Sequence, residues 1–366
     1  MTRLGVVYGY PLRYATSIET AGLVRHLGVD VVSCLPREHP DKRIENLGRL
    51  RANLVDPFRP GFACDLLLYG NDGIADVALL KRVRRVPAVL VWYDAYRDYV
   101  SDPPPRRRVV DRMRYRNVRE ADLVLGVSDL LVDMARRLQG REDGAVYMPT
   151  GVDTTLFDPA RHDGAAARRR LGLPESSIVV GYLGRVGLPR TATFAGQPLL
   201  EASPLVRADV RYLVVAWGER MPEFRDFAGR LPTRDRFVFA PFVPHGEVPS
   251  YLAACDVLVD TLDDLFLSRA RNETKMKEYL AMGRPIVATA VGENLKDLDD
   301  GRAGILVPPG DPAAIARAID ELASAPERRR ELGRRARARA LERYDWRVVA
   351  GGVRRALESR GLVDPV

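Results

Sequence analysis

The 366-residue sequence has few cysteines and histidines and no long apolar run. Its three cysteines are too few and too widely spaced for a disulfide framework, and they form no metal-ligand cluster with the four histidines. We therefore expect a cytoplasmic protein without a metal site. No uninterrupted apolar stretch approaches 18 residues, so we expect no membrane-spanning segment. The short apolar run at residues 4–8 predicts a first strand rather than a signal peptide.

The composition is that of a globular protein. Hydrophobic residues make up 46% and charged residues 29%, which excludes disordered, collagen-like and coiled-coil chains. The length favours two domains. Only five of the 57 basic residues are lysines, and this arginine-rich usage is typical of a GC-rich bacterial genome.

The net charge of +8 is concentrated in two stretches. Residues 103–119 carry seven arginines and one acid, and residues 325–347 carry nine arginines and four acids, so the remaining chain is slightly acidic. Aromatic residues are not interleaved with these arginines as in nucleic-acid binders, so we expect no nucleic-acid partner. The stretch 106–119 could line an anionic acceptor, face a membrane or be a solvated helix surface.

Short apolar runs alternate with helical patterns along the chain. Helical patterns cover residues 20–27, 106–119, 248–254, 275–282, 312–322 and 347–357. Buried strands are predicted at residues 4–8, 29–34, 65–69, 88–92, 123–127, 145–148, 178–183, 211–216, 237–240, 257–259, 286–289 and 305–307. This order predicts an α/β protein with parallel, doubly wound sheets.

Proline and glycine cluster after Met148, which is typical of a domain connection. We predict a first Rossmann-like domain at residues 1–170, completed by a C-terminal helix at 347–366, and a second at residues 174–345. In such sheets ligands bind beyond the carboxyl ends of the strands.

Three groups of residues could bind an anion, and the third, Lys275 with Glu278, is described in the next paragraph. Thr16 or Ser17, after the glycine-containing loop at Gly9, could cap a helix whose free amides attract phosphate, although an ordinary capped helix fits equally well. Arg185 and Arg190 follow a buried strand and could clamp a pyrophosphate, or be plain surface arginines.

Lys275 and Glu278 lie three residues apart at a predicted helix start. Lysine can contact phosphate and glutamate can accept hydrogen bonds from ribose hydroxyls, whereas an ordinary surface salt bridge is the alternative. His245 could reach the ligand-binding edge, but packing or exposure is the commoner fate of such a histidine.

A series of motifs resembles the retaining glycosyltransferase family 4 of the GT-B fold. They occur in the family's order and cover most of the chain: Ala121 to Ser128, Met148 to Pro159, the loop of Arg185 and Arg190, Lys275 to Pro285, Gly304 to Pro312, and Tyr344-Asp345-Trp346. The resemblance implies two Rossmann-like domains facing across a cleft, with a C-terminal helix that crosses back to the first domain.

The resemblance also implies the reaction and its residues. A sugar would pass from a nucleotide-diphosphate-sugar donor to an acceptor hydroxyl, with retention and without a metal or cofactor. The acceptor would be a small molecule, a glycolipid or a polysaccharide, and a peripheral membrane contact is one option. Residues implied for the diphosphate are Arg185, Arg190 and Lys275; for the rest of the donor, Glu278, Phe242, Val243, Glu273 and Thr274; on the acceptor side, Gly9, Thr16, Ser17, Asp94 and Asp153.

The sequence departs from the family pattern at three places. Ala270 replaces a glutamate eight residues before Glu278, Thr16-Ser17 replaces a glycine pair, and Tyr93 replaces a histidine. These changes leave the donor sugar open. They also keep two alternatives: another GT-B activity such as a nucleotide-sugar epimerase, or a catalytically silent GT-B partner subunit.

Overall fold

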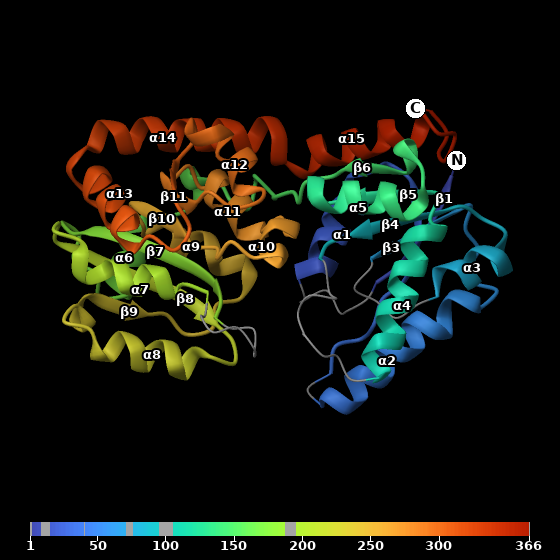
Figure 1. The fold of residues 1–366 in the computed structure, drawn as a ribbon, viewed down its shortest axis with the longest axis horizontal. Coiled ribbons are helices and arrows are strands. Elements are labelled where there is room, and N and C mark those ends of the chain that lie inside the picture. The colour runs from blue at the N-terminus through green and yellow to red at the C-terminus, as the bar shows by residue number, and fades with distance from the viewer. Residues whose placement is uncertain are drawn as a thin grey trace. The chain divides into compact units, whose positions relative to one another are not determined.

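The computed structural model describes residues 2–8, 15–39, 41–70, 76–94, 105–186 and 195–365, without the side chains of 15–18 and 105–108. The chain forms two compact units (Figure 1). Unit 1 contains residues 1–151, 269–272 and 346–366, and unit 2 contains residues 152–268 and 273–345.

Unit 1 is built on a six-stranded parallel sheet in the order β2-β1-β3-β4-β5-β6. The central strands are rich in Val and Leu and fully buried, as expected for a parallel sheet covered on both faces. The strands are β1 (Arg3–Val7), β2 (Asp30–Cys34), β3 (Leu66–Gly70), β4 (Ala88–Trp92), β5 (Leu123–Gly126) and β6 (Ala145–Tyr147).

Helices connect these strands. Several begin at a capping side chain, such as Asp76 before α3 and Ser128 before α5. The helices of unit 1 are α1 (Ala15–His26), α2 (Lys42–Leu54), α3 (Val77–Arg84), α4 (Pro105–Glu120), α5 (Asp129–Gln139) and the C-terminal α15 (Trp346–Glu358), with short turns η1 (Asp56–Phe58) and η3 (Glu142–Gly144).

The C-terminal helix belongs to unit 1, as predicted. Trp346 at the start of α15 is part of the core of unit 1, and a Cβ on Gly22 of α1 would lie only 2.5 Å from the Trp346 ring. Close packing of α1 on α15 therefore requires a glycine at this position.

One strand of unit 1 differs from its prediction. Strand β2 was expected to be buried, but its first residues are exposed and Val31 is 42% accessible. Because β2 is the edge strand of the sheet, only one neighbour covers it.

Unit 2 has the same architecture, with a parallel sheet in the order β12-β11-β10-β7-β8-β9. The order places β10 beside β7, so the carboxyl ends of these two strands are adjacent. The strands are β7 (Ile178–Arg185), β8 (Val210–Trp217), β9 (Phe237–Phe239), β10 (Val257–Asp260), β11 (Ile286–Thr289) and β12 (Ile305–Val307).

The helices of unit 2 include two that the site depends on, α11 (Thr274–Ala281) and α12 (Asn294–Asp297). The other helices are α6 (Gly164–Arg170), α7 (Gln197–Ala202), α8 (Met221–Arg230), α9 (Val248–Ala253), α10 (Phe266–Ala270, which runs into the unit 1 segment), α13 (Pro312–Ser324) and α14 (Pro326–Arg339). Short turns are η4 (Pro159–Arg161), η5 (Ser203–Leu205), η6 (Arg234–Arg236), η7 (His245–Glu247), η8 (Asp299–Gly301) and the π-turn η9 (Ala340–Tyr344).

Residues 152–170, which the sequence prediction assigned to the first domain, belong to unit 2. Helix α6 packs on α9, and Arg168 ties it to the strand region by an ion pair with Asp256 at 2.5 Å. The two doubly wound domains predicted from the strand–helix alternation are confirmed. Within the described residues, no helix is long and apolar enough to cross a membrane.

Candidate functional site

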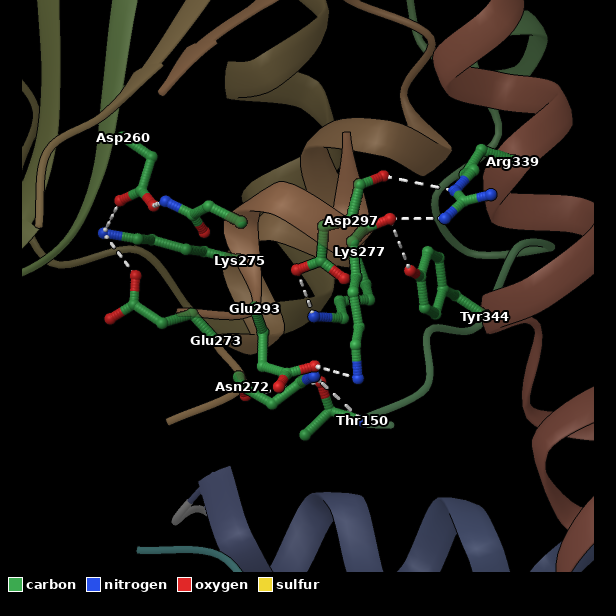
Figure 2. A network of polar contacts seen from close by, with 12 residues as sticks. Thr150, Asp260, Asn272, Glu273, Lys275, Lys277, Glu293, Asp297, Arg339 and Tyr344 are labelled. Atoms are coloured by element: carbon green, nitrogen blue, oxygen red, sulfur yellow. Dashed lines mark hydrogen bonds and ion pairs between the residues drawn. The ribbon is translucent and has the colours of Figure 1, made fainter. Parts of the chain in front are cut away.

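Lys275 stands where the start of α11 meets the carboxyl ends of β7 and β10 (Figure 2). Its Nζ lies 2.7 Å from Oδ1 of Asp260, the last residue of β10, and 3.1 Å from Oε2 of Glu273. It also lies 5.1 Å from the centre of the Tyr182 ring on β7. The Lys275 side chain is 13% exposed and that of Asp260 is fully buried. We call Asp260, Glu273 and Lys275 the Lys275 cluster.

Charge and burial shift the pKa values within this cluster. Burial raises the pKa of the Asp260 carboxyl to about 6, against the opposing effect of the Lys275 ammonium. Burial on its own would lower the pKa of Lys275, but the carboxylates of Asp260 and Glu273 outweigh it, so this pKa lies well above its usual value. Lys275 is therefore a permanent cation already paired with two carboxyl groups.

The other oxygen of Asp260 is also fixed. Asn294 at the start of α12 donates a hydrogen bond from Nδ2 to Asp260 Oδ2 at 3.1 Å, and the same Nδ2 donates to the carbonyl oxygen of Thr289. The Thr289 hydroxyl in turn bonds the backbone of Leu262, after β10. Because each neighbour of Asp260 is itself held, the carboxylate has a single orientation.

A glycine keeps the backbone beside this cluster bare. Gly184 on β7 has φ +151°, and a Cβ there would lie 3.5 Å from the Nζ of Lys275. The next residue, Arg185, is half exposed and pairs with Glu219, with its Nε 3.2 Å from Oε2 and its Nη2 on Oε1. The hydrogen bond from Arg185 lowers the pKa of the Glu219 carboxyl.

Glu278 forms a second polar pair on α11. Its Oε1 lies 2.7 Å from Nε2 of His245 in η7, and its side chain is 5% exposed. This hydrogen bond raises the pKa of His245, whose ring also lies 5.4 Å from the ring of Phe157. The alternative of a surface salt bridge between Lys275 and Glu278 is wrong, since both side chains are buried and each has a different partner.

The segment after β9 supplies the other donor-side residues. Phe242 is 73% exposed, whereas Val243 is buried. Trp217, at the carboxyl end of the neighbouring strand β8, is 45% exposed. Thr274 is the first residue of α11. Arg190 lies outside the described residues.

The residues predicted for the acceptor side fall in different parts of the chain. Gly9 lies outside the described residues. Helix α1 begins at Ala15, so Thr16 and Ser17 lie inside its first turn and the prediction that one of them caps it is wrong. In unit 1, Asp94 Oδ2 lies 3.4 Å from Arg271 Nε. Asp153 belongs to unit 2, where its Oδ1 accepts hydrogen bonds from two backbone amides of the following turn.

Within the described residues, no group of three His, Cys, Asp or Glu side chains could hold a metal ion. One Asp-x-Asp sequence, Asp297-Leu298-Asp299, does occur, but its carboxylates have other partners. Asp297 Oδ2 lies 2.6 Å from the buried Lys277 Nζ, and Asp299 pairs with Arg302 and Arg339.

Two functional candidates, Asp260 and Glu219, were not found from the sequence. His245 was considered able to reach the ligand-binding edge, with packing or exposure as the commoner outcome, and its pairing with Glu278 was not predicted. Asp260 carried a usable signal, because it is a charged residue directly after a run of buried strand residues. Nothing local in the sequence pairs His245 with Glu278, which are 33 residues apart.

Comparison with known proteins identifies the family of unit 2. Residues 177–325 match the family described as glycosyl transferases group 1. A D-inositol 3-phosphate glycosyltransferase of Acidothermus cellulolyticus is 34% identical over 267 residues, which are 69% of this chain and 56% of that protein. The corresponding protein of Streptomyces avermitilis is 31% identical, covering 68% of this chain and 53% of that protein. The chain thus spans about half the length of the curated relatives it matches.

Solved structures share the fold at low sequence identity. Anabaena Alr3699/HepE in complex with UDP and glucose aligns with a TM-score of 0.79 and 18% identity, covering 98% of this chain and 100% of that one. WaaG, a glycosyltransferase involved in lipopolysaccharide biosynthesis, aligns with a TM-score of 0.69 and 13% identity over 96% and 98% of the two chains. The resemblance predicted from the motifs is confirmed: the chain has the GT-B fold, and its residues 177–325 are a glycosyl transferases group 1 domain.

Proposed function

We propose that this protein transfers a sugar from a nucleotide-diphosphate-sugar donor to an acceptor hydroxyl, with retention of configuration and without a metal. The observation that carries the proposal is the carboxyl edge of the unit 2 sheet, where a half-exposed arginine, a glycine, a buried carboxylate and a partly exposed carboxylate lie on neighbouring elements. The relatives named D-inositol 3-phosphate glycosyltransferase and the HepE complexes with UDP-glucose support this class of donor.

The charges around Lys275 and Arg185 make Arg185 the better partner for a diphosphate. Lys275 already faces two carboxylates, so with both ionised the cluster carries one net negative charge and disfavours a diphosphate beside it. Arg185 is the better partner for the diphosphate: its guanidinium is half exposed and would exchange the two oxygens of Glu219 for two phosphate oxygens, which can also accept a pair of hydrogen bonds from arginine. We therefore propose a different role for Lys275 from the contact with the diphosphate that the motif implies.

In this proposal Lys275 is a positioning residue. It orients Glu273, whose side chain is 19% exposed, so that the carboxylate accepts hydrogen bonds from hydroxyls of the donor sugar. Glu273 thereby takes over from the family glutamate, because Ala270 in its place is fully buried in the core of unit 1 and has no polar side chain. Glu278, held by His245, would accept hydrogen bonds from the ribose hydroxyls.

The chemistry requires little else from the protein. As the anomeric bond breaks, negative charge develops on the departing diphosphate, and a fixed guanidinium stabilises it without reorganisation. The leaving phosphate would take the proton of the attacking hydroxyl on the same face of the sugar, so the pair of acid and base carboxylates of glycoside hydrolases is not needed.

The test is a panel of nucleotide-diphosphate sugars, measured for binding and for donor hydrolysis. We expect turnover of at least one donor, unchanged by EDTA, with the product keeping the donor's anomeric configuration by NMR. Glu278→Gln should reduce turnover about 10²-fold or more. The control Glu327→Gln, on an exposed side chain of α14, should leave it unchanged.

Two results would contradict the proposal. Absence of donor binding at millimolar concentration would favour a catalytically silent GT-B subunit. Near-wild-type turnover of Glu278→Gln would show that α11 does not hold the donor.

A further inference from the structure

Helix α2 of unit 1 exposes its large apolar residues and buries two polar ones. Glu45 is 2% exposed and Asn53 is 1% exposed, although both are polar. The exposed large apolar residues are Ile44 (49%), Leu47 (64%), Leu50 (44%), Leu54 (45%) and the adjoining Val55 (50%) and Phe58 (37%). With 3.6 residues per turn, Ile44, Leu47, Leu50, Leu54 and Val55 fall within about 140° of the helix circumference. We call these five residues and Phe58 the α2 stripe.

Hydrogen bonds fix this orientation of the helix. Asn53 donates from Nδ2 to the carbonyl oxygen of Tyr8, after β1, at 3.1 Å and to the carbonyl oxygen of Arg49 at 3.0 Å. Lys42 Nζ lies 3.4 Å from Glu45 Oε1. Rotating the helix to bury its leucines would break the hydrogen bond from Asn53 to the carbonyl oxygen of Tyr8. This hydrogen bond therefore keeps the leucines on the solvent side.

Helix α3 also exposes two large apolar residues. Leu79 and Val83 lie one turn apart on α3 and are 47% and 55% exposed. Arg84, at the end of α3, donates to the carbonyl oxygens of Pro57 and Arg59 at 2.6 and 2.5 Å, which joins this helix to η1 beside the stripe. Figure 1 draws α2 and α3 in blue at the outer edge of unit 1.

Basic residues are interspersed with the α2 stripe along the chain. Between residues 41 and 59 there are three acids, Asp41, Glu45 and Asp56, and five basic residues. Two of these acids have cationic partners: Glu45 faces Lys42, and Asp56 Oδ1 lies 3.2 Å from Arg51 Nε and 3.1 Å from Arg59 Nε. The basic residues are Lys42, Arg43, Arg49, Arg51 and Arg59. An apolar stripe with arginines among its leucines fits the boundary between lipid headgroups and acyl chains, because a long arginine side chain can reach the headgroups while the leucines enter the acyl region.

From this arrangement we infer that α2, with Leu79 and Val83 of α3, is a docking surface for an anionic lipid bilayer. Charge favours the bilayer over a second copy of this chain, since two identical faces with a net positive charge would meet across an isologous interface. The basic helix α4, the earlier candidate, fits less well. Among its described side chains, Val109 is the only large apolar residue that is strongly exposed, so α4 offers little apolar area to the acyl region.

The inference does not depend on the proposed function, because vesicle binding is measured without turnover. The experiment is co-sedimentation of the full chain with vesicles of phosphatidylcholine and phosphatidylglycerol, and with vesicles of phosphatidylcholine alone. The chain should bind the anionic vesicles in low salt, and added NaCl should weaken this binding. The variant Leu47→Gln/Leu50→Gln/Leu54→Gln should lower the apparent affinity about tenfold or more.

A matched control distinguishes loss of the α2 stripe from loss of exposed apolar area elsewhere in the protein. Leu205→Gln/Leu341→Gln/Val348→Gln removes three side chains of similar exposure (50%, 43% and 42%) from other elements and should bind like the wild type. Circular dichroism should show both triple variants folded. Equal binding of the two variants, or no binding of the wild type in low salt, would overturn the inference. So would a wild-type dimer that the α2 substitutions convert to a monomer.

Discussion

Two lysines on α11 sit two residues apart and have opposite surroundings. Lys277 is fully buried, with Nζ 2.6 Å from Asp297 Oδ2 and 5.3 Å from the centre of the Tyr344 ring. Lys275 is 13% exposed and faces the two carboxylates of its cluster at the carboxyl edge of the sheet (Figure 2). The two residues project from different sides of the helix.

The comparison separates an ion pair enclosed within unit 2 from one that we propose to belong to the donor site. The pair of Lys277 and Asp297 joins α11 to α12 where no ligand can reach it. The Lys275 cluster has more acid than base, keeps a partly exposed carboxylate, and lies beside a backbone that a glycine leaves bare. Substitutions at the first pair should therefore change stability, and those at the second should change turnover.

The largest effect is expected for Lys277→Ala. It leaves the Asp297 carboxylate buried without its cation, which should reduce the free energy of unfolding by about 3–5 kcal/mol in urea titration. The double variant Lys277→Met/Asp297→Leu should recover much of that loss, because no charge is then left buried. A loss under 1 kcal/mol for Lys277→Ala would remove the distinction between the two lysines.

Lys275→Ala should act on turnover. Without the ammonium, Glu273 loses the group that orients it, and a displaced contact should reduce kcat/KM about 10²-fold. The loss of unfolding free energy should be smaller than for Lys277→Ala, because Asp260, whose pKa is already raised to about 6, can take up a proton. Unchanged kcat/KM in Lys275→Ala would contradict a positioning role.

The twelve strands were predictable because each is a short apolar run between helical patterns, and every run from residues 4–8 to 305–307 forms a strand. The partners in the ion pairs could not be predicted from the sequence. Asp260 ends β10 and Lys275 lies in the first turn of α11, and they meet because the intervening chain returns α11 to the carboxyl end of β10, which local sequence does not encode. Nor did the sequence reasoning find α2: its apolar residues have helical spacing, but they face outward because Asn53 binds Tyr8.

The variant Asp260→Asn should change the pH dependence of turnover. The folded-state pKa of about 6 lies above the usual 3.8, so the folded protein binds this proton more tightly than the unfolded chain. The contribution of Asp260 to the free energy of unfolding therefore falls as the pH rises from about 4 to about 6. We expect wild-type turnover to decline below about pH 6, where Asp260 loses the charge that holds Lys275. In Asp260→Asn that decline should disappear, and a persisting decline would assign it to another group.

The smallest effect is expected for His245→Gln. The hydrogen bond to Glu278 raises the pKa of His245 above its usual 6.5, so its stabilising contribution is complete below pH 6.5 and is lost as the pH rises through the folded-state value. The side chain is 41% exposed, and solvent screening keeps this contribution below about 1 kcal/mol. Thermal melts of the two proteins at pH 5.5 and pH 8.5 measure it; a larger difference at the higher pH would reverse the sign we expect.

The most direct test compares kcat/KM for the nucleotide-sugar donor found in the panel in two variants, Lys275→Met and Lys277→Met/Asp297→Leu. Both remove one buried lysine charge from α11, and both must first be shown to be folded. We predict a loss of about 10²-fold in Lys275→Met and a change within a few-fold in the double variant. Equal losses in the two variants would contradict the assignment of the Lys275 cluster to the donor site.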